Sequence, residues 1–150
     1  MVLAGAGGES TSSLTGSATR ILAEQPALQR ELRANPLLIP DFVEEAVCLE
    51  SSFRGHYRAV RRDTKLGDVE LPQSSRILLL WAAANRDPET FESPDSVDLG
   101  RPNLREHLAF GRGIHFCVGA RLAGLEARII LEELLARTQS FSLDPVAGSP

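Results

Sequence analysis

Apolar residues recur at helical spacing from about residue 3 to residue 24, which predicts a long helix at the start of the chain. Gly5, Gly7 and Gly8 lie near its beginning. Each glycine costs about 1 kcal/mol relative to alanine in a helix interior, because its backbone loses more conformational freedom. We therefore expect this helix to be interrupted near its start, by a kink or by the close approach of another group.

Two shorter helices are predicted to follow the first one. The second covers residues 26–34, because proline is favourable at a first helical position and the next proline stops the helix. The third covers residues 40–51, where Phe42, Ala46 and Leu49 repeat at helical spacing and acidic side chains occupy the first turn.

The pattern changes to short extended segments over residues 58–81. Residues 66–68 form the expected turn between two of them, and residues 76–81 are the best candidate for a strand. Residues 85–109 contain prolines, glycine and several Asp and Asn residues, so they predict an irregular segment. A connection of that length usually carries function.

A long amphipathic helix is predicted over residues 117–137. Its apolar positions form two rows, 118, 122, 125 and 129 together with 123, 127, 130 and 134. A stripe of this width should be largely buried, while Glu126, Arg128, Glu132 and Glu133 mark the solvated side. The elements together predict a mainly helical fold with a small β-sheet.

Composition is consistent with one globular domain over residues 1–150, since 43% of the residues are hydrophobic and 24% are charged. The net charge is −4 and the basic residues are scattered, so no nucleic-acid or polybasic membrane surface is indicated. The longest apolar run, residues 77–84, is too short to cross a bilayer, and no secretory leader is evident. We therefore expect a cytoplasmic protein with no membrane or nucleic-acid partner.

The segment with the clearest chemistry is residues 110–119, which place Cys117 in a glycine-containing loop just before the last predicted helix. Free backbone N–H groups and the positive end of a helix dipole favour a thiolate there, and Arg112 and His115 add positive charge. Thiolate is a strong ligand for iron. A merely structural cysteine would leave the glycines and the basic residue unexplained.

This segment resembles the haem loop of the cytochrome P450 family, which has Phe, Gly, a basic residue, Cys and Gly at fixed spacing. All five are present, as Phe110, Gly113, His115, Cys117 and Gly119. The resemblance implies that Cys117 is the metal ligand of haem b, the proximal thiolate on its iron. The cofactor-binding residues it implies are Cys117, Arg58, His115, Phe110, Gly111, Gly113, Gly119, Ala6 and Gly7.

A second landmark of the family, Ala/Gly-Gly-x-Asp/Glu-Thr, resembles residues 6–10 in the glycine-rich first helix. In the family this helix crosses the distal face of the haem, where small residues leave room for dioxygen. The resemblance assigns proton delivery to Glu9 and Ser10, with Thr11 beside them, and Ser10 keeps a hydroxyl where threonine is usual. Without the haem loop, the same residues would be interpreted as an ordinary Gly/Ser-rich helix start.

Arg58 and His115 match positions where the family contacts the haem propionates. Guanidinium and imidazole N–H donors suit an anionic cofactor edge. The alternative for Arg58 is a solvated arginine in a charged strand. His56 and His107 are interpreted as structural residues.

A third landmark, Glu-x-x-Arg, corresponds to residues 45–48, but Cys48 stands where the family has arginine. In the family this pair joins a basic residue, which Arg101 resembles, in a buried charge network. Loss of one partner from such a network costs about 3–5 kcal/mol. We expect Glu45 and Arg101 to form the remaining network, Cys48 to be a small buried thiol, and Cys48→Arg to improve stability and haem uptake.

The resemblance covers nearly the whole chain and is closest to bacterial-type members. It implies the C-terminal portion of the fold, with the N-terminal half and the last strands absent. The implied reaction is insertion of one oxygen atom of O2 into a small organic substrate. The electrons would come from NAD(P)H through a ferredoxin and ferredoxin reductase. The alternatives are a truncated or degenerate haem-binding fragment without catalysis, and a redox-sensitive thiol protein without iron.

Overall fold

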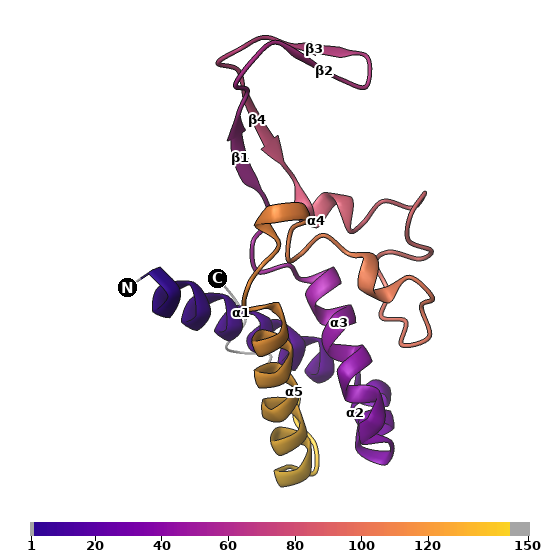
Figure 1. Ribbon diagram of the computed structural model, residues 1–150. Helices are drawn as coiled ribbons and strands as arrows, with labels where there is room; N and C mark the ends of the chain where they lie inside the picture. The colour runs from indigo at the N-terminus through magenta and orange to yellow at the C-terminus, as the bar shows by residue number, and fades with distance from the viewer. Residues whose placement is uncertain (1, 145–150) are drawn as a thin grey trace.

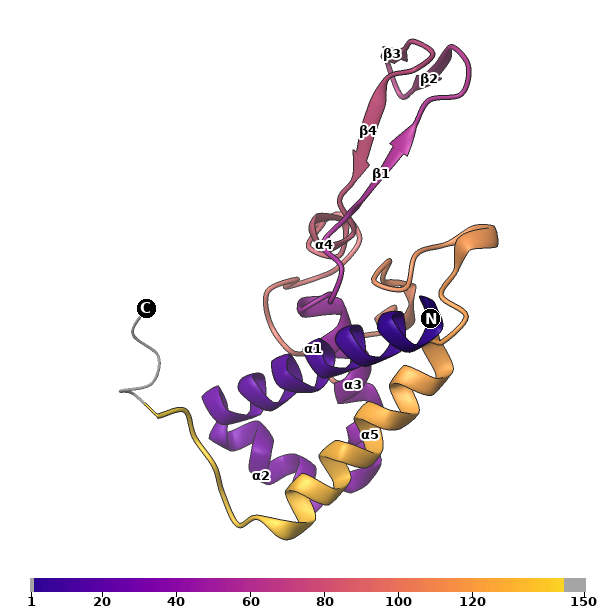
Figure 2. The ribbon, with the colours of Figure 1, turned by 90° about the vertical axis from the view of Figure 1, so that its left-hand side faces the viewer.

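The computed structural model describes residues 2–144, with side chains from residue 6 onward. Helices pack into one body, and paired strands project from it as a long ribbon (Figures 1 and 2). The prediction of a mainly helical fold with a small β-sheet is confirmed, and the described strands pair antiparallel. Within the described residues, no helix is both long and apolar enough to cross a membrane.

The first helix, α1 (Val2–Glu24), runs without interruption, so the predicted break near its start is wrong. A Cβ added to Gly7 or Gly8 would meet no neighbouring atom within 4 Å, which also excludes close approach of another protein segment. The glycines lower helix propensity only in the first turns, whereas burial of residues such as Leu14 and Ala18 stabilises the later turns. Packing of those turns therefore outweighs local propensity.

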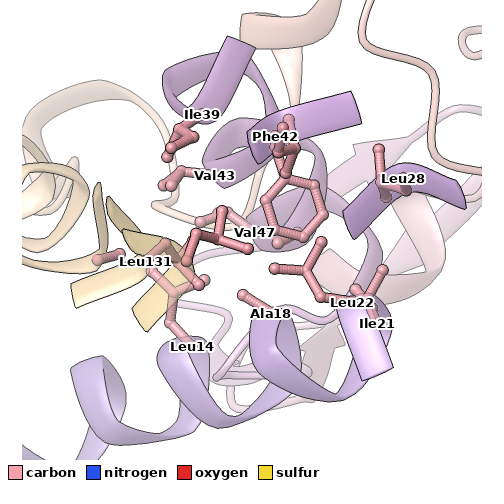
Figure 3. Close-up of a cluster of buried hydrophobic side chains, with 14 residues drawn as sticks. Leu14, Ala18, Ile21, Leu22, Leu28, Ile39, Phe42, Val43, Val47 and Leu131 are labelled. Atoms are coloured by element: carbon pink, nitrogen blue, oxygen red, sulfur yellow. The ribbon is translucent and has the colours of Figure 1, made fainter. Parts of the chain in front are cut away.

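The core lies where α1 meets α2 (Pro26–Ala34), α3 (Ile39–Leu49) and α5 (Ala120–Arg137). Figure 3 shows side chains of these helices meeting around Phe42, which is fully buried. Leu22 and Leu131 are also fully buried. A 3-10 turn over Pro36–Leu38 connects α2 to α3.

The ribbon consists of two antiparallel strand pairs. Strand β1 (His56–Ala59) pairs with β4 (Arg76–Leu79), and β2 (Thr64–Leu66) pairs with β3 (Val69–Leu71). Gly67 has φ +56°, the left-handed conformation that the predicted turn at residues 66–68 requires. The predicted strand over 76–81 is two residues too long, because Trp81 begins the short helix α4 (Trp81–Ala84).

Residues 85–109 are irregular as predicted, with one 3-10 turn at Leu104–Glu106. Asn85 is completely buried and fastens this segment to α3. Its amide nitrogen donates to the Cys48 carbonyl at 3.3 Å and to the Ser51 hydroxyl at 3.1 Å. Its side-chain oxygen accepts from the Leu108 N–H at 2.7 Å. One amide side chain thus ties α3 to the loop that precedes Cys117.

Helix α5 differs from its prediction in two respects. It begins at Ala120 and not at Cys117, because residues 117–119 form a turn that leads into the helix. Only Ala127, Leu131 and Leu135 on α5 are buried, at a spacing of four residues that faces α1 and α3. The apolar row Leu122, Leu125 and Ile129 is 58%, 49% and 48% exposed, so the predicted burial of the whole stripe is wrong for the described part of the chain.

Candidate functional site

A cavity of about 530 Å³ lies between the N-terminal half of α1, the base of the β1–β4 pair and the loop before α5. The proximity of that loop to α1 can be followed in Figure 2. Ten of the predicted site residues line it, and they come from α1, from β1 and from the loop over residues 110–119. They are Ala6, Gly7, Ser10, Thr11, Arg58, Phe110, Gly111, His115, Cys117 and Gly119.

Two predicted site residues do not line this cavity, Glu9 and Gly113. Helical geometry explains Glu9, since positions 6, 7, 10 and 11 share one face of α1 while the exposed Glu9 points elsewhere. Gly113 has φ +73° and serves the loop conformation. Its role is therefore in shaping the backbone that carries Cys117.

The loop over residues 110–119 presents Cys117 through its backbone geometry. Gly111 and Gly113 have φ values of +72° and +73°, which an L side chain rarely adopts. The Cys117 N–H donates to the Phe110 carbonyl at 2.9 Å and closes the loop. The Cys117 carbonyl in turn accepts from the Ala120 N–H at 3.3 Å, at the start of α5. The exposed thiol therefore stands at the positive end of an 18-residue helix.

Cationic and N–H donor side chains line the same cavity. Arg58 lies on β1, and Arg112 and His115 lie on the cysteine loop. Among the described residues no ion pair involves Arg58, whose side chain donates only to the Tyr57 carbonyl at 3.1 Å. These groups are thus available to an anionic ligand.

The residues present fit a haem. Apolar side chains such as Leu14, Leu79 and Val118 form much of the wall, and the space beside Gly7 holds no protein atom within 4 Å of an added Cβ. A thiol at one face, small residues at another and cations at the edge suit a flat apolar ring that carries carboxylates. The donor set is therefore suitable for haem b, which Cys117 could ligate.

The cavity is also lined by three residues that were not predicted to belong to the site, Phe53, His56 and Trp81. His56 and Arg58 stand two residues apart on a strand, so they share a face. Its two-residue spacing from Arg58 is the sequence feature that could have placed His56 at the cavity. His107, by contrast, is a structural residue as interpreted, since it is buried and its Nε2 lies 3.1 Å from Glu44 Oε2.

A buried ion pair joins α3 to the irregular segment over residues 85–109. Arg101 Nε donates to Glu45 Oε1 at 2.7 Å, and the two side chains are only 3% and 1% exposed. The Asp98 N–H donates to Glu45 Oε2 at 3.0 Å. The remaining Arg101 nitrogens donate to the carbonyl groups of Glu92, Ser93 and Ser96. The hydrogen bond with Glu45 raises the pKa of Arg101, so this guanidinium stays charged.

Cys48 is buried next to this pair, with its sulfur 3.9 Å from the Asn85 carbonyl. Burial, followed by the charge of Glu45, raises the pKa of the Cys48 thiol to about 11. Both oxygens of Glu45 already have donors, so a neutral thiol leaves no carboxylate oxygen unsatisfied. The described residues contain no cluster of three or more metal-ligating side chains that would include it.

The two thiols should differ sharply in reactivity. At pH 8 we expect an aromatic disulfide reagent to modify Cys117 quickly, because it is exposed, and Cys48 only after unfolding. A pKa of about 11 leaves about one part in a thousand of Cys48 as thiolate at that pH. Cys117→Ser should remove the fast phase and Cys48→Ser should keep it. Rapid modification of two thiols per native chain would contradict the burial of Cys48.

The same pKa sets a pH dependence of stability. The folded-state pKa of Cys48 lies above its ordinary value of 9.0, so the folded chain holds this proton more tightly than the unfolded chain does. Its contribution is fully present below pH 9 and is lost as the pH rises through about 11. Cys48→Ser should reduce that alkaline loss of stability in denaturant titrations at pH 8 and pH 11.

Fold and cavity together define a class of protein, one that presents a single cysteine from a glycine loop to an apolar, cation-edged cavity. The sequence model of the family described as Cytochrome P450 matches residues 36–149. The chain belongs to the cytochrome P450 family, whose members are haem-thiolate monooxygenases.

Individual relatives are bacterial. Cytochrome P450 144 of Mycobacterium tuberculosis is 53% identical over 148 residues, covering 99% of this chain and 34% of that protein. Mycocyclosin synthase of the same species is 41% identical over 140 residues, covering 93% of this chain and 35% of that protein.

Among solved structures, the substrate-free cytochrome P450 CYP150A6 of Mycobacterium marinum superposes with a TM-score of 0.91 at 39% identity, covering 95% of this chain and 35% of that one. The chain thus spans about a third of the length of the relatives it matches.

Proposed function

We propose that this chain provides the cysteine-bearing haem site of a cytochrome P450 monooxygenase. The observation that carries the proposal is the placement of Cys117, Arg58 and His115 around the same cavity as the small residues of α1. These residues come from three separate segments of the sequence. A cysteine with only a structural role would require no such arrangement.

Cys117 is the proposed iron ligand, held at the N-terminus of α5 by the Cys117–Phe110 backbone hydrogen bond. The helix dipole stabilises its negative charge. Arg58 and His115 are the proposed propionate partners, and Phe110 is the proposed packing partner of the sulfur. When bound, haem supplies the activation of dioxygen, and the protein's part is to hold, orient and tune it.

Ser10 and Thr11 are the proposed proton carriers on the opposite wall. The Ser10 hydroxyl donates to the Ala6 carbonyl at 2.6 Å, which leaves its oxygen free to accept a hydrogen bond from a proton source. The Thr11 hydroxyl lies one residue on, at the same cavity. Glu9, exposed on the neighbouring face of α1, would exchange protons with solvent and pass them to the Ser10 and Thr11 hydroxyls.

The proposed substrate class is a small, largely apolar organic molecule, because the wall is mostly apolar. Related structures differ widely in what they bind, since one is a complex with (4-ethylphenyl) dihydrogen phosphate and another is a complex with corticosterone. We propose NAD(P)H as the electron source and a ferredoxin with its reductase as the donor. The cytoplasm, where these donors are available, is the proposed location.

Oxygen insertion can be tested with isotopic oxygen. The haem-loaded chain, given NADPH, ferredoxin and ferredoxin reductase under 18O2, should place one 18O atom in a product from a panel of small lipophilic compounds. Ser10→Ala should lower product yield per NADPH by about 10²-fold or more, the usual contribution of positioned proton transfer. Haem binding with no 18O incorporation in any product would support the non-catalytic alternative instead.

A further inference from the structure

One side-chain pair in the cavity wall has no role in the function proposed above. The Trp81 indole Nε1–H donates to His56 Nδ1 at 2.8 Å. Both residues line the cavity, and the Phe53 ring lies 5.4 Å from the His56 ring. Trp81 is half-buried, at the start of α4, and His56 is at the start of β1. The pair therefore joins two elements at the base of the ribbon.

This hydrogen bond determines which imidazole nitrogen carries the proton. An indole N–H can only donate, so Nδ1 of His56 must present its lone pair. An imidazolium has N–H groups at both nitrogens and cannot accept this bond. While this bond is made, the proton of a neutral His56 imidazole is on Nε2. Among the described residues, no acceptor is found for that Nε2–H.

The position of His56 relative to Arg58 suggests the acceptor. Both are on the same face of β1, since side chains two residues apart on a strand point to the same side. Both line the cavity. The two residues therefore present an N–H donor and a guanidinium side by side, about 6–7 Å apart along the strand. That combination suits a carboxylate with several lone pairs to satisfy.

We propose that His56 is a second donor to the carboxylate edge of the bound cofactor, next to Arg58, and that Trp81 is the positioning residue that fixes its tautomer and orientation. The inference rests on the proposed haem site. It adds a residue pair to that site. In this arrangement His56 contributes a directed N–H donor, whereas Arg58 contributes the charge.

The test compares two probes, haemin and haemin dimethyl ester, in which both carboxylates are masked. Dissociation constants for the full chain are measured by Soret absorbance. His56→Phe should weaken haemin binding by about tenfold, as expected for loss of one hydrogen bond to a charged group. It should leave ester binding unchanged. Tyr57→Phe is the matched control, because Tyr57 is the neighbouring residue on β1 and does not line the cavity.

Two conservative variants separate the donor role from packing. His56→Gln keeps an N–H donor near the position of Nε2, so it should restore most of the haemin affinity lost in His56→Phe. Trp81→Phe keeps the ring but removes the indole donor. In two-bond 1H–15N spectra of histidine, the native chain should show His56 as the Nε2–H tautomer, and Trp81→Phe should show a mixture of both tautomers.

The outcomes distinguish this inference from the proposed function. If the native chain fails to bind haemin in a Cys117-dependent manner, the haem site itself is wrong, and this inference with it. If haemin binds but His56→Phe weakens haemin and the ester equally, His56 acts through packing and the inference is overturned. An Nδ1–H tautomer in the native chain would overturn it as well.

Discussion

Arg101→Met should destabilise the chain by about 3–5 kcal/mol, which is the cost of removing one partner from a buried ion pair. The variant leaves the carboxylate of Glu45, only 1% exposed, with the Asp98 N–H as its remaining donor. It also leaves three backbone carbonyl groups without the guanidinium. Domains are typically stable by only 5–15 kcal/mol, so the loss should be visible as a large drop in the denaturant midpoint.

The matched control is Arg137→Met, because Arg137 also pairs with a glutamate but is 79% exposed. Exposed pairs of this kind contribute about 0–1 kcal/mol, so the control should be nearly neutral. Glu45→Gln added to Arg101→Met should recover part of the loss, since it removes the unpaired charge. A loss below about 1 kcal/mol in Arg101→Met would contradict the role given to this pair.

The cysteine at position 48 bears on the same network. The structure satisfies Glu45 through Arg101 and the Asp98 amide, whereas the sequence alone indicated only that one of three partners was missing. No sequence pattern shows whether a backbone N–H will donate a hydrogen bond to the second oxygen of a buried carboxylate. The expected gain from Cys48→Arg is therefore limited to what a further donor to Glu45 can add, about 1.5–3 kcal/mol before the cost of burying another guanidinium.

The site was largely predictable from sequence because its residues lie in short motifs with fixed spacing. Residues 110–119 need glycines at two positive-φ positions, and Gly111 and Gly113 occupy them. The helical period places residues 6, 7, 10 and 11 on one face, and those residues line the cavity. Local chemistry and local geometry are enough to predict such features.

The errors arose where the outcome depends on distant packing. The glycines of α1 cost helix propensity locally, but burial of Leu14 and Ala18 keeps the helix continuous. The apolar row of α5 predicted burial, yet only the residues that face α1 and α3 are covered in the described chain. The contact between His56 and Trp81 was not predicted, because the two residues are 25 positions apart in sequence.

Cys117→Ala should abolish thiolate ligation and lower haem affinity by more than about a hundredfold. Loss of an outer-shell partner alone commonly costs 10–100-fold in metal affinity, so loss of the ligand should exceed that range. The cavity walls, Arg58 and His115 remain in this variant, so weak apolar binding of haem should persist without the thiolate spectrum. Cys48→Ala is the matched control, because it removes the other thiol from a buried, neutral position.

The most direct measurement is the absorption spectrum of the haem-reconstituted chain, reduced under carbon monoxide, beside Cys117→Ala and Cys48→Ala. We predict a strongly red-shifted Soret band in the native chain and in Cys48→Ala, because both would keep the Cys117 thiolate as a ligand, and loss of the red shift in Cys117→Ala. A native spectrum without the red shift, or one that survives in Cys117→Ala, would contradict the assignment of Cys117 as the haem ligand.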